Sequence, residues 1–427
     1  MHIYFCGIGG AGLAPLAMLC RDIGWTVSGS DTAESLNTTE LKTRDIDFEL
    51  DQSGNYLQKT HHDNPVDWFV YSSAVTDQNQ EYLAAKKMGL TMTKRDELLN
   101  CILKEKNLKL LAVAGTHGKT TTTAMLVWLF QKIGVPVSYL IGSNISFGAA
   151  ASYQEGSRYF VYECDEFDRN FLSFSPQFAL VPSLDYDHPD TYPTKEMYRT
   201  AFHQFFAQCD AVIGWQVDLL TVTKDLPQML LYNSASGGEP GLTLFGAHNR
   251  QNMSLVLWML ERLMLTDAEF GVQKSIVELL PFANIFPGTQ RRQEKIATNV
   301  YRDYAHHPVE IAATLAAFAE EFDRICVVYQ PHQNIRQHAI VGEYAHCFDA
   351  AYAVYWLPTY LSREDPKLEI LSQKTLADAV KSDVQIHLAA LDANLKQQLI
   401  HEKSTGSVLV FLGAGSIDAW AREHFIN

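Results

Sequence analysis

A glycine-containing segment followed by Lys119 and Thr120 has the residue types and spacing of a phosphate-binding loop. The apolar run 110–114 precedes it and predicts a buried strand, and the apolar pattern of residues 124–129 predicts a helix after it. Backbone N–H groups at the start of such a helix bind an anion, the lysine reaches the terminal phosphates, and the threonine hydroxyl binds Mg²⁺. The segment is shorter than the usual G-x-x-x-x-G-K-[ST] loop, because Val113 stands where that pattern has its first glycine. We predict that it binds ATP through Gly115, Thr116, His117, Gly118, Lys119, Thr120 and Thr121.

Acidic residues follow two further predicted strands. The apolar strand that reaches Glu163 continues into more acids as far as Asp168, and the strand 178–184 leads into aspartates on both sides of His188. In α/β folds ligands bind at this carboxyl edge of the sheet, and carboxylate oxygens are donors that Mg²⁺ prefers. A solvated acidic loop and a hydrogen-bonded loop histidine remain the alternatives. The phosphate-binding loop favours a magnesium site.

The N-terminal residues predict a second phosphate-binding unit. A strand runs into a glycine-rich turn, a helix extends to about residue 22, and a second strand ends close to Asp31. In such a βαβ unit a pyrophosphate lies on the helix N-terminus and the acid contacts a ribose or base. NAD and other nucleoside diphosphates satisfy the same requirements. A purely structural tight turn would also use the same glycines, so the pattern does not choose among them.

Composition and charge set the class of protein. The chain has 427 residues, of which 47% are hydrophobic, so several domains with large cores are expected. Its net charge of −15 disfavours a nucleic-acid partner. The seven cysteines are scattered without a C-x-x-C pair, which is typical of reduced thiols. Without a signal peptide or a long apolar run, the sequence predicts a cytoplasmic protein that does not enter a membrane.

The remaining segments give weaker indications. Residues 216–240 lack a clear period and predict a surface excursion. Asn249 and Asn252 stand near an expected helix start, where they would cap the helix or contact an adenine. Strands and helices alternate again after residue 287, and the polar strand ends 303–308 and 330–336 would suit a binding site or ordinary surface capping.

The motifs along the whole chain resemble those of the Mur ligase family of peptidoglycan synthesis. In order, they are G-I-G-G-A-G with S-G-S-D, A-G-T-H-G-K-T-T-T, E-C-D-E, D-Y-D-H-P-D-T-Y, H-N-x-x-N, G-x-x-R-R, D-Y-A-H-H-P and Y-Q-P-H. The resemblance implies an α/β fold of three domains. These are an N-terminal Rossmann-like UDP-substrate domain (residues 1–107), a central P-loop-type ATPase domain (108–287) and a C-terminal Rossmann-like domain (288–427).

The resemblance also implies roles for single residues. Lys119 matches the phosphate lysine, Thr120 and Glu163 match metal ligands, and His188 matches the residue that holds a second Mg²⁺. The other implied site residues are Asn252, Arg292 and Asp303 for ATP, Tyr304 and His306 in the catalytic site, and Gly9, Gly10, Gly12, Asp31 and Ser73 for the UDP sugar.

The implied reaction is an ATP-dependent amide ligation. Three motifs are similar to those of the subgroup that uses UDP-N-acetylmuramate as acceptor. They are the G-I-G-G-A-G start of the chain, D-Y-A-H-H-P and Y-Q-P-H. In the implied reaction, L-alanine is joined to the lactyl carboxylate through an acyl phosphate, with ATP and Mg²⁺ as cofactors. The alternative is the attachment of a recycled tripeptide to the same nucleotide. An NAD-dependent oxidoreductase would leave Lys119, Glu163 and His188 without a role.

The sequence departs from the family pattern most clearly in the segment that is expected to bind the amine substrate. Gln333 replaces one of the arginines that the relatives usually have in P-H-R-Y-S/T-R-T, whereas Arg336 is retained. We expect Arg336 to bind the carboxylate of the amine substrate, with His332 alongside, because a buried anion needs such a partner. The alternative is that Arg336 begins a helix and points to solvent.

Two further positions differ from the family pattern. Ser183 stands where the relatives usually have asparagine, and Arg302 stands where they have the first of two aspartates. Residues 199–204 contain no lysine that would correspond to the carbamoylated lysine of several Mur ligases.

Overall fold

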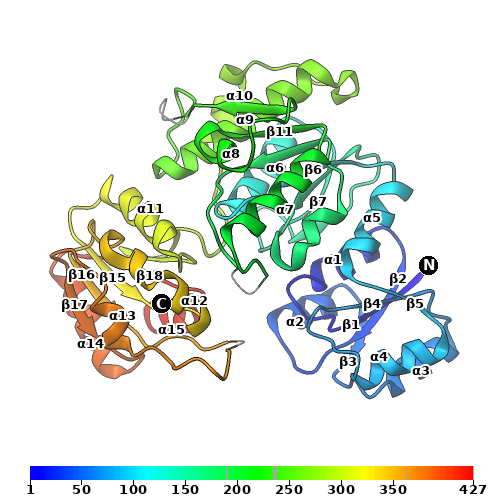
Figure 1. Cartoon of the computed structure of the whole chain (residues 1–427), viewed down its shortest axis with the longest axis horizontal. Coiled ribbons are helices and arrows are strands. Elements are labelled where there is room, and N and C mark those ends of the chain that lie inside the picture. Colours follow the sequence, from blue (N-terminus) through cyan, green and yellow to red (C-terminus); the bar gives the residue numbers. More distant parts are fainter. Residues whose placement is uncertain (189–190, 234–237, 363, 427) are drawn as a thin grey trace. The chain divides into compact units, whose positions relative to one another are not determined.

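The computed structural model describes residues 1–188, 191–233, 238–362 and 364–426. Figure 1 shows the helices and strands of the chain, coloured from the N-terminus (blue) to the C-terminus (red). The chain forms two compact units. The first comprises Met1–Asp185, Glu196–Asn233 and Leu255–Phe282, and the second comprises Tyr186–Lys195, Ser234–Ser254 and Ala283–Asn427. Across the described ranges, no helix has both the length and the apolar character that crossing a membrane requires.

The first unit begins with a five-stranded parallel sheet in the order β3-β2-β1-β4-β5. β1 is central and entirely buried, because helices cover both faces of a parallel sheet. The strands are β1 (His2–Cys6), β2 (Thr26–Ser30), β3 (Asp47–Glu49), β4 (Trp68–Tyr71) and β5 (Thr91–Thr93). The helices are α1 (Ala14–Asp22), α2 (Leu36–Thr43), α3 (Asn55–Asp63), α4 (Gln80–Met88) and α5 (Arg95–Glu105).

The same unit contains a seven-stranded sheet in the order β12-β11-β10-β6-β9-β7-β8. Only the β7–β8 pair is antiparallel. The strands are β6 (Lys109–Val113), β7 (Val137–Leu140), β8 (Ala151–Ser152), β9 (Tyr159–Glu163), β10 (Phe178–Val181), β11 (Ala211–Trp215) and β12 (Met229–Tyr232). The helices around it are α6 (Lys119–Lys132), η1 (Phe167–Ser173), α7 (Lys195–Ala207), α8 (Gln216–Val222), α9 (Ala247–Thr266), η3 (Ala268–Phe270) and α10 (Ile276–Asn284).

Helix α6, which follows the phosphate-binding loop, is buried on all sides over most of its length. Every residue from Thr121 to Phe130 is buried, so the helix has no solvent-exposed side along this stretch. A helix that is buried all round passes through the interior of a domain. The predicted strand, loop and helix around Lys119 are therefore confirmed.

The expectation of a surface excursion over residues 216–240 is wrong for residues 216–222 and 229–232. Residues 216–222 form α8, and residues 229–232 form β12, which pairs in parallel with β11 at the edge of the sheet. β12 has only four residues and none of them is fully buried. A short, half-exposed edge strand shows little of the apolar pattern on which sequence interpretation depends. Residues 234–237 of this segment lie outside the described residues.

The second unit contains a six-stranded sheet in the order β13-β14-β18-β15-β16-β17, in which only β13 and β14 are antiparallel. The strands are β13 (Glu294–Ala297), β14 (Val300–Asp303), β15 (Ile325–Tyr329), β16 (Ala353–Trp356), β17 (Gln385–Leu388) and β18 (Val408–Leu412). The helices are α11 (Pro308–Ala319), α12 (Asn334–Ile340), η4 (Val341–His346), α13 (Gln373–Ala377), α14 (Ala393–Ser404) and α15 (Ile417–Phe425).

The two faces of this sheet form separate cores. Val327 and Val410 point to the face covered by α11, whereas Val328 and Leu409 point to the face covered by α14 and α15. This alternation follows from the period of two along each strand. The predicted α/β fold, with a mainly parallel sheet in each of three successive parts of the chain, is confirmed.

Candidate active site

The phosphate-binding loop connects β6 to α6 with a backbone that requires glycine at two positions. Gly115 has a φ of +124° and Gly118 a φ of +81°, and a Cβ on Gly115 would lie only 2.5 Å from the carbonyl oxygen of Ser183. α6 begins at Lys119, directly after the loop. The first N–H groups of the helix therefore face the loop, as an anion site requires.

Lys119 has its cationic group inside this loop. Its Nζ donates to the carbonyl oxygens of Gly115 at 2.6 Å and Thr116 at 3.2 Å, and it lies 2.7 Å from Oε2 of Glu166. Burial alone lowers the pKa of Lys119, but Glu166 and Asp165 raise it above its usual value. The lysine is therefore a permanent cation at the point where phosphate oxygens would bind.

The predicted metal ligands Thr120 and Glu163 lie together. The Thr120 hydroxyl donates to Oε1 of Glu163 at 2.8 Å, and the N–H of Gly142 donates to Oε2 at 2.7 Å. A Cβ on Gly142 would lie 2.7 Å from that oxygen, so the approach needs glycine. A hydroxyl and a carboxylate are hard oxygen donors, and this pair fits Mg²⁺.

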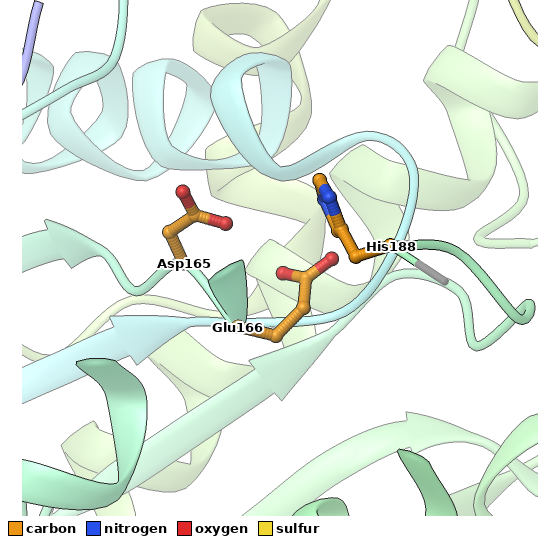
Figure 2. A group of neighbouring side chains, drawn as sticks. All are labelled: Asp165, Glu166 and His188. Carbon is orange, nitrogen blue, oxygen red and sulfur yellow. The ribbon is translucent and has the colours of Figure 1, made fainter. Parts of the chain in front are cut away.

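Asp165 and Glu166, which follow β9, are acids that the sequence analysis did not single out as site residues. Figure 2 draws them with His188, which follows β10, as a group of side chains that could hold a metal ion. Glu166 is 1% exposed, so its carboxylate is buried beside Lys119. Both acids belong to the acidic run that begins with Glu163 at the end of β9. That run indicated a metal site, but only Glu163 was predicted as a ligand.

Ser183 is a second residue that the sequence analysis did not assign to the site. Its Oγ accepts a hydrogen bond from the N–H of His117 at 2.8 Å and donates to the carbonyl oxygen of His117 at 3.2 Å. Its own carbonyl oxygen accepts from the N–H of Thr116 at 3.0 Å. Ser183, just after β10, therefore holds three successive peptide groups of the phosphate-binding loop.

Two aspartates, Asp185 and Asp218, lie close to the phosphate-binding loop. Nε2 of His117 is 3.6 Å from Oδ2 of Asp185. Burial raises the pKa of Asp218, at the start of α8, to about 6, and the charge of Asp185 acts in the same direction. Asp218 therefore titrates closer to neutral pH than an ordinary aspartate.

In the N-terminal sheet, the glycine turn after β1 and Asp31 after β2 are in direct contact. Oδ2 of Asp31 accepts from the N–H of Gly9 at 2.7 Å, and Nδ2 of Asn37 donates to the carbonyl oxygen of Gly9 at 2.9 Å. Part of the role of Asp31 is thus to shape the turn. A Cβ on Gly12 would collide with the guanidinium group of Arg95.

The other residues predicted for the UDP sugar lie on the glycine turn and on the turn after β4. A Cβ on Gly10 would lie 3.2 Å from the carbonyl oxygen of Gly7. Ser73 is exposed in the turn after β4, the neighbour of β1. The structure therefore brings the glycine turn and Asp31 together and leaves Ser73 accessible.

In the second unit, Asp303 organises the segment that carries Arg292. Its two carboxylate oxygens accept from the N–H groups of Gln293 and Ala305, both at 2.7 Å. Burial raises the pKa of Asp303, and the nearby Arg292 acts against this rise. The guanidinium carbon of Arg292 lies 5.1 Å from the ring centre of Tyr304.

His306 and His332 are neighbouring imidazoles in this unit. Their ring centres are 5.8 Å apart, and Nδ1 of His306 lies 2.9 Å from the carbonyl oxygen of Tyr304. Burial lowers the pKa of His306 to about 4, against the opposing effect of Glu310. His306 is therefore neutral at pH 7 and able to accept a proton.

The alternative that Arg336 points to solvent is wrong. Arg336 lies in α12, its side chain is 12% exposed, and its Nη2 is 3.7 Å from Oδ2 of Asp187. Although burial raises the pKa of Asp187, Arg336 and His188 hold it well below its usual range. Arg336 is thus a buried cation that already has a carboxylate partner.

The capping interpretation of the two asparagines is also wrong. α9 begins at Ala247, so Asn249 and Asn252 lie within the helix. Nδ2 of Asn249 donates to the carbonyl oxygen of Phe245 at 3.0 Å and to Oε1 of Gln293 at 2.8 Å. Asn252 is 7% exposed. Its predicted contact with ATP stays a prediction.

Three family models together cover most of the chain. Residues 2–107 match "Mur ligase family, catalytic domain", residues 113–227 match "Mur ligase middle domain", and residues 289–415 match "Mur ligase, glutamate ligase domain". A curated UDP-N-acetylmuramate–L-alanine ligase from Nocardioides sp. is 32% identical over 434 residues, which cover 98% of this chain and 94% of the relative. The chain belongs to the Mur ligase family.

Solved structures of Mur ligases share the fold over the full chain. The UDP-N-acetylmuramate-alanine ligase from Thermotoga maritima has a TM-score of 0.75 and 25% identity, covering 99% of this chain and 98% of that one. The murein peptide ligase from Psychrobacter arcticus has a TM-score of 0.63 and 21% identity at the same coverage. The second similarity concerns the fold alone.

The departures from the usual Mur ligase pattern have local structural explanations. Arg302 is 2% exposed, and its Nη1 forms a close ion pair with Asp418 of α15, so the unusual cation is balanced inside this unit. Gln333 has a φ of +60°, and its N–H donates to the carbonyl oxygen of Tyr360 at 2.9 Å. Its backbone therefore sets the start of α12, which carries Arg336.

Proposed function

We propose that this Mur ligase joins L-alanine to the lactyl carboxylate of UDP-N-acetylmuramate in an ATP-dependent reaction. The observation that carries the proposal is the placement of Lys119 and the Thr120–Glu163 pair on one glycine loop, in a chain that matches a UDP-N-acetylmuramate–L-alanine ligase over nearly its full length. Curated relatives from Agrobacterium and from other bacteria carry the same name.

The proposed reaction has two steps. The lactyl carboxylate attacks the γ-phosphorus of ATP, which releases ADP and leaves an acyl phosphate. The amine then attacks the acyl carbon, and phosphate leaves from the tetrahedral intermediate. The first step brings two anions together, so positive charge and positioning supply most of the catalysis.

The phosphate-binding loop and the residues that would hold Mg²⁺ supply that charge. Lys119 and the N-terminal N–H groups of α6 bind the β- and γ-phosphates. Thr120 and Glu163 would hold Mg²⁺ and His188 a second ion, and Mg²⁺ when bound neutralises phosphate charge. The loop 115–121 binds the triphosphate, with Ser183 fixing its shape.

The N-terminal glycine turn binds the diphosphate of the sugar nucleotide through Gly9, Gly10 and Gly12. Asp31 and Ser73 contact the remainder of the UDP sugar. Backbone N–H groups at the start of α1 bind the diphosphate in the same way as those at the start of α6 bind the phosphates of ATP.

Further residues are assigned to the amine substrate and to ATP. Asn252, Arg292 and Asp303 contact ATP, and Tyr304 and His306 lie close to the reacting groups. The amine attacks as the neutral NH₂ group, and His306, neutral at pH 7, accepts the proton that its nitrogen loses from the tetrahedral intermediate. Arg336 exchanges Asp187 for the carboxylate of the amino acid, with His332 alongside.

A phosphate-release assay tests the proposal. Purified protein with ATP, Mg²⁺ and UDP-N-acetylmuramate should release phosphate when L-alanine is added, and less with glycine or L-serine. Release with L-alanyl-γ-D-glutamyl-meso-diaminopimelate, and none with L-alanine, would instead assign the tripeptide reaction. Tight binding of NAD without any binding of the UDP sugar would contradict the role of the N-terminal glycine turn.

A further inference from the structure

Glu81, on α4, is a completely buried carboxyl group to which no role has been assigned above. Its Oε1 accepts a hydrogen bond from the Tyr4 hydroxyl at 2.7 Å, and its Oε2 accepts one from the Ser30 hydroxyl. Burial raises the pKa of Glu81, and hydrogen bonds from Cys6, Ser30 and Tyr4 oppose that rise. A carboxyl group at this depth is unfavourable unless its oxygens are satisfied. Donors from both β1 and β2 satisfy it here.

Ser30 connects this buried group to the glycine turn. Ser30 is the last residue of β2, and its carbonyl oxygen accepts hydrogen bonds from the N–H groups of residues 7–8, both at 2.8 Å. The next residue, Asp31, accepts from the N–H of Gly9 at 2.7 Å. The tip of β2 therefore holds three successive peptide groups of the turn, and Glu81 holds the side chain of Ser30.

We propose that Glu81 is a positioning residue for sugar-nucleotide binding, which acts through Ser30 to hold the glycine turn 7–12 in its binding conformation. The inference rests on the proposed function, which assigns the UDP substrate to that turn. A turn that is ordered before the ligand arrives does not spend binding free energy on ordering. If only a fraction of the molecules has the turn formed, the apparent Kd rises by the inverse of that fraction.

Ser28 provides a matched control on the same strand. The two serine hydroxyls are buried two residues apart on β2, so they lie on the same face of the sheet. Oγ of Ser28 lies 2.8 Å from Nε2 of His2, whereas Oγ of Ser30 bonds to Glu81. Removal of either serine hydroxyl deletes one buried hydrogen bond, but only Ser30 borders the turn.

Calorimetric titration with UDP-N-acetylmuramate and steady-state kinetics test the proposal on the full chain. Ser30→Ala and Glu81→Gln should each raise the Kd and the KM for the sugar nucleotide about fivefold or more, since a buried hydrogen bond that orders the turn is lost. The KM for ATP should stay within about twofold of the wild-type value in both variants, because the ATP loop belongs to another sheet. Ser28→Ala should leave the Kd for the sugar nucleotide unchanged.

The outcomes separate this inference from the proposed function. An unchanged Kd in Ser30→Ala would overturn the positioning role, as would an equal rise of the Kd in Ser28→Ala. If Glu81→Gln does not fold, Ser30→Ala alone decides. Wild-type protein that binds no uridine nucleotide would overturn the proposed function on which the inference rests.

Discussion

Nζ of Lys119 and Oε2 of Glu166 form a buried ion pair at 2.7 Å, in which the lysine side chain is 13% exposed and the glutamate 1%. The lysine belongs to the phosphate-binding loop and the glutamate follows β9, so the pair joins two neighbouring strand ends. Removal of the lysine takes away the cation that balances the buried carboxylate of Glu166, which costs far more than the loss of an exposed pair would.

Lys119→Ala should therefore lose ATP-dependent turnover and also lose stability, by about 3 kcal/mol. The double variant Lys119→Ala/Glu166→Gln should regain most of that stability, because no charge is left buried, yet remain inactive. Thermal unfolding and phosphate release measure the two effects. Lys132→Ala, at the other end of α6, is the control and should keep activity. Near-normal turnover by Lys119→Ala would remove the argument for the phosphate-binding loop.

Glu163→Gln should raise the Mg²⁺ concentration needed for half-maximal activity and cost about 3 kcal/mol of transition-state stabilisation. The amide keeps the shape of the side chain and the partners Thr120 and Gly142, but it binds Mg²⁺ weakly. A magnesium titration of initial rates measures the effect. Asp168→Asn serves as control, because Asp168 is 40% exposed and pairs with Lys94. Identical magnesium curves for wild type and Glu163→Gln would reduce Glu163 to a structural role.

Asp218→Asn should stabilise the protein at neutral pH. Burial raises the folded-state pKa of Asp218 to about 6, above the ordinary value of an aspartate. A carboxyl group with a raised folded pKa contributes stability at low pH, and this stability is lost as the pH rises through about 4 to 6. The difference in melting temperature between the variant and the wild type should thus be small near pH 4 and reach a constant positive value above pH 6. Asp225→Asn, exposed and seven residues further on, should show no such rise. A difference that is independent of pH would refute the assignment.

Arg336→Ala should raise the KM for the amino acid at least about tenfold, equivalent to roughly 1.4 kcal/mol for a charged hydrogen bond. The KM for ATP should stay nearly unchanged. Arg324→Ala, which removes an arginine paired with Glu402 in the same unit, is the control. An unaltered amino-acid KM in Arg336→Ala would mean that Asp187 is the permanent partner of this arginine.

Elements with continuous apolar runs were predictable. β15 and β18 are elements of this kind, because both are central strands in which every residue is buried. β12 was missed because an edge strand of four half-buried residues has no such run. A run of apolar residues thus predicts a strand that is fully buried, but it does not predict a strand that is only partly buried.

The candidate site was predictable where residues adjacent in sequence act together. The loop 115–121 could be expected from its own residues, whereas Glu163 was assigned among the acids at the end of β9 through the family resemblance. Glu166 and Ser183 could not, because their partners depend on which strands become neighbours of β6. The contact of Arg336 with Asp187 likewise joins residues about 150 positions apart, and only the tertiary fold creates it.

The double hydrogen bond between Ser183 and the peptide groups of His117 involves no formal charge. Ionic strength screens exposed ion pairs but leaves neutral hydrogen bonds almost unaffected. The phosphate-binding loop should therefore keep its conformation in concentrated salt. Any loss of ATP affinity under those conditions would report screening of the nucleotide's own charge, and a salt titration becomes a measure of the electrostatic part of binding alone.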